Sequence, residues 1–179
     1  MKNILNKIII SSVMFLSIIF IGCKAFQLTQ DNIGPISNVI GMASGAVVNM
    51  TDLDDTVKTS VIEIMNTTKS YLPQNEETCV NIWTPYINEK IKELINSNKL
   101  DAKYEKTVQQ ICIKAASGID YLYNKYSNIK QYYNMAIIAV DNFIIGFTSV
   151  INTTGHQAII IPTEYQTEYE QAYEHMLNN

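Results

Sequence analysis

The chain contains no arginine, and all of its basic residues are lysines. Its 13 lysines are outnumbered by 17 acidic residues, which gives a formal net charge of −4 at pH 7. Nucleic acids and anionic lipid surfaces bind proteins that carry basic patches, and a chain with this charge balance has little basic surface to offer. We therefore expect no nucleic-acid partner and no polybasic contact with a membrane.

Residues that carry out catalysis or bind metals are equally scarce. There are two histidines, His156 and His175, and the sequence has no H-x-x-x-H, C-x-x-C or G-x-S-x-G motif and no phosphate-binding glycine pattern. The pairs Asp54-Asp55 and Glu76-Glu77 are better explained as helix caps, because no Ca²⁺-loop spacing surrounds them. The sequence predicts a protein that is not an enzyme and that has no cofactor and no metal. A small hydrolase using His156 and a carboxylate is the alternative.

The N-terminal stretch has the pattern of an export signal. Lys2 and Lys7 precede an uncharged apolar run from Ile8 to Ile21, which is typical of a signal peptide. Such a run rises about 21 Å as a helix, whereas the hydrocarbon core of a membrane is about 30 Å thick. A permanent membrane span is therefore the weaker interpretation.

The apolar run closes with Phe20-Ile21-Gly22-Cys23, which resembles the lipobox of bacterial lipoprotein precursors. The resemblance covers the leader alone and implies a signal peptide at residues 1–22, with palmitate or similar acyl chains on Cys23. Two or three acyl chains anchor a protein stably, whereas one does not. Lys24, in place of Asp, implies a location in a Gram-negative outer membrane, facing the periplasm or the outside.

The remaining two cysteines predict a disulfide. Removing residues 1–22 from the 179-residue chain leaves 157 residues, enough for a tether at 23–34 and a single domain at 35–179. An exported protein sits where disulfides persist, so we expect Cys79 and Cys112 to be bonded. The closed loop would stabilise the fold by roughly 3 to 4 kcal/mol. The alternative is two buried thiols.

Apolar residues recur at three- and four-residue spacings along most of the mature chain, which predicts helices. Thr84-Pro85 matches an N-cap followed by proline at the first helical position, so a helix is expected to start there. Gly41 and Gly45 form a G-x-x-x-G pattern that favours close helix packing inside the domain. We expect a compact all-α bundle of five or six helices, over about 36–47, 55–72, 85–95, 101–126, 129–151 and 163–177.

The helix expected at 129–151 is the most apolar part of the mature chain. Asn134, Asp141 and Thr148 recur every seven residues, which predicts a narrow polar stripe facing water. A pore or a membrane span made from this helix is the weaker alternative, because a central aspartate is costly in lipid.

Tyrosine is abundant, with 11 residues, and two groups of tyrosines are candidates for partner binding. Tyr126 and Tyr133 belong to a cluster around the turn that precedes residue 129, and Tyr165, Tyr169 and Tyr173 form a stripe on the last helix. Such amphipathic rings suit a partner surface and equally suit the rim of a small core. The last helix either docks on the lysines of the helices at 85–95 and 101–126 or reaches a partner.

These patterns together predict a membrane-anchored envelope lipoprotein that binds a protein partner without catalysis. The expected architecture is similar to that of secretin pilotins, small helical lipoproteins that carry a partner helix to the outer membrane. This similarity is one of fold alone. An immunity or phage-exclusion lipoprotein that blocks an incoming factor is a further alternative.

Overall fold

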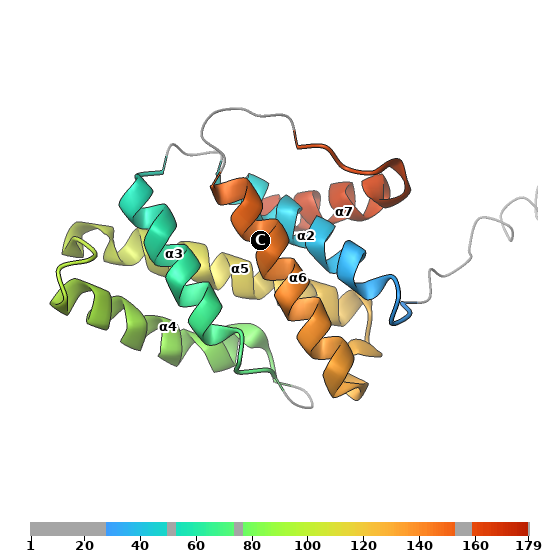
Figure 1. Cartoon of the computed structure of the whole chain (residues 1–179), viewed down its shortest axis with the longest axis horizontal. Helices are drawn as coiled ribbons and strands as arrows, with labels where there is room; N and C mark the ends of the chain where they lie inside the picture. The colour runs from blue at the N-terminus through green and yellow to red at the C-terminus, as the bar shows by residue number, and fades with distance from the viewer. Residues whose placement is uncertain (1–27, 50–52, 74–76, 153–158, 179) are drawn as a thin grey trace, which may run out of the picture.

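The computed structural model describes residues 28–49, 53–73, 77–152 and 159–178 (Figure 1). The expected signal peptide, Cys23 and His156 lie outside the described residues. Within these ranges the structure has six α-helices and no strand, which confirms the predicted all-α bundle. The helices are α2 (Ile33–Val48), α3 (Asp55–Thr68), α4 (Cys79–Asn96), α5 (Glu105–Lys125), α6 (Tyr133–Ile151) and α7 (Gln166–Asn178).

The bundle is organised around α2, which packs against α6 on one side and α7 on the other, while α4 and α5 form an antiparallel pair (Figure 1). The largest fully buried side chains are Trp83 of α4, Tyr123 of α5, and Phe143 and Phe147 of α6. One apolar core therefore draws side chains from all six of the described helices.

Glycines let α2 and α6 approach each other closely. A Cβ atom on Gly41 of α2 would lie 2.8 Å from the carbonyl carbon of Phe143, and a Cβ atom on Gly45 would lie 2.7 Å from the carbonyl oxygen of Phe147. Gly146 of α6 in turn faces the backbone of Asn38. The G-x-x-x-G pattern therefore serves packing inside the domain, as predicted.

Polar contacts flank this glycine interface. The Asn38 side chain donates from Nδ2 to the carbonyl oxygen of Asn142 at 3.3 Å, and Asn49 donates to the carbonyl oxygen of Val150 at 3.2 Å. Since both partners advance along the chain together, α2 and α6 run in the same direction. Side-chain donors thus bind α6 at two points along its length.

The predicted start of a helix at Thr84-Pro85 is wrong, because α4 begins six residues earlier, at Cys79, and contains Pro85. The Thr78 side chain accepts from the Asn81 N–H at 3.2 Å, while the Asp120 carboxylate of α5 accepts from Cys79 N–H at 2.6 Å and Val80 N–H at 3.1 Å. These acceptors satisfy the donors that a helix N-terminus leaves unpaired. The cap from α5 is a long-range contact that local sequence does not reveal.

The predicted disulfide is also corrected: Cys79 and Cys112 are both buried and are not bonded to each other. The register of the α4–α5 pair explains this. Cys79 lies beside Asp120 of α5. Cys112 is eight residues before Asp120, so it lies about 12 Å away from this contact along the axis of α5. A disulfide requires Cα atoms within about 7 Å. The alternative of two buried thiols is the one the structure shows.

The other helix boundaries follow the sequence more closely. Asp54 caps α3 by accepting from Thr56 N–H at 2.8 Å, and Asp101 accepts from Lys103 N–H at 2.9 Å in the turn before α5. Hydrogen bonds from Thr56 hold the pKa of Asp54 below its usual value, because they favour the charged carboxylate. The turn expected before residue 129 is present, but α6 begins at Tyr133, after a short 3₁₀ turn, η2 (Ile129–Gln131).

Candidate functional site: the exposed face of α6

Of the described helices, α6 alone is long and apolar enough to cross a membrane, judged by length and composition. More than half of its apolar window is buried inside the bundle, and Phe143 and Phe147 are fully buried. A helix that packs this way is a core helix of the domain. The remaining face of α6 is exposed, and it combines apolar and charged side chains.

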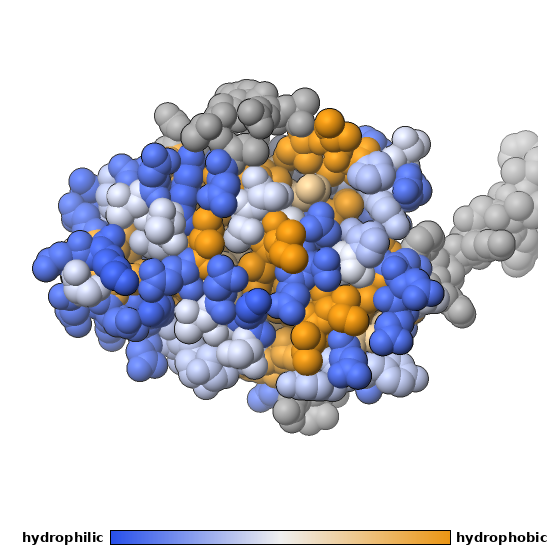
Figure 2. All heavy atoms as spheres, in the orientation of Figure 1, coloured by the Kyte–Doolittle hydropathy of each residue, from blue (hydrophilic) through white to orange (hydrophobic). Residues whose placement is uncertain are grey.

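Three residues at four-residue intervals form the centre of this face: Ile137, Asp141 and Ile145, which we call the α6 strip. Ile137 is 37% exposed and Ile145 is 58% exposed. Residues four apart lie along one side of a helix. Apolar surface accordingly interrupts the polar surface over α6 (Figure 2). The predicted polar stripe is thus centred on Asp141, but isoleucines flank it on both sides.

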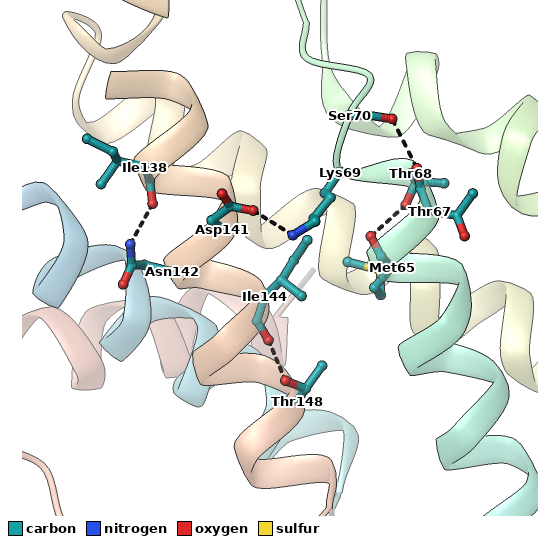
Figure 3. A network of polar contacts seen from close by, with 10 residues as sticks. All are labelled: Met65, Thr67, Thr68, Lys69, Ser70, Ile138, Asp141, Asn142, Ile144 and Thr148. Atoms are coloured by element: carbon teal, nitrogen blue, oxygen red, sulfur yellow. Dashed lines mark hydrogen bonds and ion pairs between the residues drawn. The ribbon is translucent and has the colours of Figure 1, made fainter. Parts of the chain in front are cut away.

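Asp141 forms an ion pair with Lys69, at the end of α3. The Lys69 Nζ atom lies 2.8 Å from Asp141 Oδ1, and the two side chains are 39% and 43% exposed. In Figure 3 the two side chains point toward each other across the gap between α3 and α6. The ion pair neutralises the only carboxylate on α6. An exposed pair of this kind contributes at most about 1 kcal/mol to folding.

The end of α3 positions Lys69. Its backbone N–H donates to the Met65 carbonyl oxygen at 3.1 Å, and the buried Thr68 hydroxyl donates to the Ile64 carbonyl oxygen at 3.0 Å. Ser70 donates to the Thr67 carbonyl oxygen at 3.2 Å (Figure 3). A lysine at a helix C-terminus is also favoured by the helix dipole. Lys69 is therefore held beside the strip by the backbone of its own helix.

Other polar side chains of α6 bond within their own helix. Asn142 Nδ2 donates to the Ile138 carbonyl oxygen at 2.9 Å, and Thr148 Oγ1 donates to the Ile144 carbonyl oxygen at 2.8 Å (Figure 3). Asp141, by contrast, reaches another helix through its side chain. The acid is thus the polar centre of the α6 strip.

A second exposed feature follows Lys69 by two residues. The rings of Tyr71 and Tyr86 stack with centroids 3.7 Å apart and planes 10° from parallel, and they are 39% and 36% exposed. The indole N–H of the buried Trp83 donates to the Tyr71 carbonyl oxygen at 2.6 Å, which fixes the position of the pair. No spacing in the sequence singled out this aromatic pair, because Tyr71 lies between helices.

The predicted partner-binding tyrosines divide into different environments. Tyr126 is buried, whereas Tyr133 is 68% exposed at the start of α6. Tyr165, Tyr169 and Tyr173 are half-buried and pack at the edge of the core. These three tyrosines, of which Tyr165 lies just before α7, therefore form the rim of an intramolecular contact, and Tyr133 is the predicted tyrosine that stands out into solvent.

Helix α7 was expected to dock on α4 and α5. In the structure it docks mainly on α2, and also on α5. Its buried residues are Ala172 and Met176, which sequence reasoning did not select. On α5, Lys125 Nζ donates to Gln171 Oε1 at 2.6 Å, and the Tyr121 ring stacks on His175. Burial lowers the pKa of Lys125, while the charge of Glu168 acts in the opposite direction.

The described residues offer little reactive chemistry. No group of three or more His, Cys, Asp or Glu residues in them is arranged to hold a metal ion. Burial raises the pKa of the Cys112 thiol, and so keeps it protonated and unreactive. Comparison of the chain with protein-family models, with curated proteins and with solved structures finds no match.

Proposed function

We propose that this chain is a lipoprotein, anchored in an outer membrane through acyl chains on Cys23, that binds a protein partner through the α6 strip. The anchor is supported by the lysine-flanked apolar run and by Gly22-Cys23 in the sequence. The observation that carries the binding role is the exposure of Ile137 and Ile145 on either side of the neutralised Asp141.

The α6 strip has the composition of a small binding surface. Protein interfaces combine apolar contacts at the centre with polar groups that fix orientation. Covering Ile137 and Ile145 would contribute about 1 kcal/mol each through burial of apolar area. The Lys69–Asp141 pair favours a partner whose polar groups hydrogen-bond to the two charges, because burying the pair without such bonds costs desolvation free energy.

The partner that fits such a strip best is an amphipathic helix. Apolar side chains at three- or four-residue spacing on that helix would meet the two isoleucines, as in other helix-on-helix contacts. A role that carries a partner helix to the membrane, like that of the pilotins, follows from this chemistry combined with the anchor.

Site-specific photo-crosslinking in the native envelope tests the binding role. A photoreactive residue in place of Ile145 is expected to give a discrete adduct of higher mass. The same residue in place of Glu89, which is exposed on α4, is the matched control and should give none. The Ile137→Glu substitution should abolish the adduct at position 145. Equal crosslinking at positions 145 and 89, or none at either, would contradict the proposal.

A further inference from the structure

The chain enters the described bundle at a fixed point. Leu28 is only 6% exposed, and its carbonyl oxygen accepts from Asn128 Nδ2 at 3.2 Å. Asn128 directly precedes η2, whose Ile129 is fully buried. The described part of the chain thus begins beside the start of α6, on the right-hand side of Figure 1.

The distance from this point to an acylated Cys23 is short. Leu28 is the fifth residue after Cys23, and five extended residues span at most about 18 Å. The acyl chains of a lipoprotein lie inside the bilayer. Leu28 must therefore stay within about 18 Å of the membrane interface, whatever the conformation of the residues between.

Two exposed tyrosines stand at the same end of the bundle. Tyr132 is 59% exposed and Tyr133 is 68% exposed, the highest values among the aromatic residues that the structure describes. The Tyr132 N–H donates to the Ile129 carbonyl oxygen at 3.2 Å, which holds both tyrosines close to Asn128. Tyrosine is enriched at membrane–water interfaces, where its ring contacts lipid and its hydroxyl stays hydrated.

The residues around the two tyrosines are mostly polar, and their formal charges balance, since Lys130 belongs to η2 and Asp31 lies just before α2. Thr29, Gln30, Gln131 and Asn134 are exposed and uncharged, and Asp31 is an exposed acid. A mature chain that has lost Lys2 and Lys7 has 11 basic and 17 acidic residues, a net charge of −6. A zwitterionic lipid surface suits this end, since anionic lipid would repel the chain as a whole.

We propose that the end of the bundle formed by Leu28, Asn128, Tyr132 and Tyr133, called here the Leu28 end, rests on the membrane, with both tyrosines among zwitterionic headgroups. This inference rests on the proposed acylation of Cys23. Ile145 lies twelve residues beyond Tyr133, about 18 Å further along α6. The contact therefore fixes the start of α6 at the membrane while Ile145, at the far end of the α6 strip, stays open to a partner.

The test places an environment-sensitive fluorophore at the Leu28 end without changing either tyrosine. The Asn134→Cys variant of the full-length acylated protein is labelled with a nitrobenzoxadiazole group and bound to vesicles of dioleoylphosphatidylcholine. Cys79 and Cys112 are buried and acylated Cys23 has no thiol, so labelling is selective in the folded protein. The matched control carries the label at Ile160→Cys, where the native side chain is 87% exposed.

The expected result is a blue-shifted emission at position 134 and slow bleaching by dithionite on vesicles, with fast bleaching at position 160. The Tyr132→Ser/Tyr133→Ser double variant should restore fast bleaching at position 134. Raising the salt concentration should leave the slow bleaching at position 134 unchanged, since the nearby charges of Asp31 and Lys130 balance and the lipid is zwitterionic. Equal bleaching at positions 134 and 160 would overturn the proposal, as would slow bleaching that persists in the double variant.

Flotation of the same samples separates this inference from the anchor on which it rests. If the protein floats with the vesicles but bleaches equally at positions 134 and 160, the anchor is present and only the proposed orientation is refuted. Protein that does not float refutes the anchor and the orientation together. The soluble Cys23→Ser form should bleach fast at position 134 at every protein concentration. Slow bleaching that grows with its concentration would identify a second copy as the occupant and overturn the membrane contact.

Discussion

Gly41 of α2 faces the backbone of Phe143 of α6 so closely that a Cβ atom at position 41 would lie 2.8 Å from the Phe143 carbonyl carbon. Gly146 makes the reciprocal approach from α6, toward the backbone of Asn38. Neither contact can be relieved by moving a side chain, because the opposing atoms belong to helix backbones. The two glycines therefore set the distance between the two most apolar helices of the bundle.

The Gly41→Ala substitution should destabilise the fold by at least about 2 kcal/mol, because the added methyl group forces α2 and α6 apart. Urea denaturation followed by circular dichroism measures the effect. The control is Gly34→Ala, where the nearest atom to an added Cβ is the flexible Asn142 side chain at 3.4 Å. Alanine is the better helix former, so this control should be neutral or up to about 1 kcal/mol more stable. Equal stability of the two variants would rule out the close packing.

The Met176→Ala substitution should lower the free energy of unfolding by about 2 to 4 kcal/mol, because Met176 is fully buried where α7 docks. Leu177, its neighbour, is 52% exposed, and Leu177→Ala should change stability by less than about 1 kcal/mol. Thermal denaturation of the two variants compares them directly. If both variants had the melting temperature of the wild type, α7 would be a solvated helix, and the claim that it docks on the bundle would be wrong.

Thiol counting distinguishes buried thiols from a disulfide. Acylated protein, kept free of reductant, should show no reactive thiol while folded, because Cys79 and Cys112 are buried and burial raises the pKa of Cys112. After unfolding in guanidinium it should show two. The Cys23→Ser form should give the same count. A count of zero in the unfolded state would show that the two cysteines are bonded after all.

Local patterns in the sequence predicted much of the fold. Three- and four-residue apolar spacing located the helices, Asp54 marked the cap of α3, and the spacing of Gly41 and Gly45 indicated close packing. Each of these signals acts within one helix or one turn. They succeed because helix formation and capping depend on near neighbours in the chain.

Features that depend on contacts between distant segments were missed. The start of α4 is capped by Asp120, which lies 40 residues or more along the chain from Cys79 and Val80. The α4–α5 register that separates Cys79 from Cys112 depends on the same packing. On α6, the heptad of polar residues indicated a face toward water, but the exposure of Ile137 and Ile145 on that face depends on which sides of α6 the other helices cover. The α6 strip can therefore be recognised only in the folded chain.

The central claim is that acyl chains on Cys23 hold this bundle at a membrane, and metabolic labelling with palmitate in the native host tests it most directly. The wild-type protein is expected to incorporate label and to fractionate with the outer membrane. The Cys23→Ser variant should carry no label and should accumulate as uncleaved precursor or as a soluble form. Equal label in the wild type and in the Cys23→Ser variant would contradict the account.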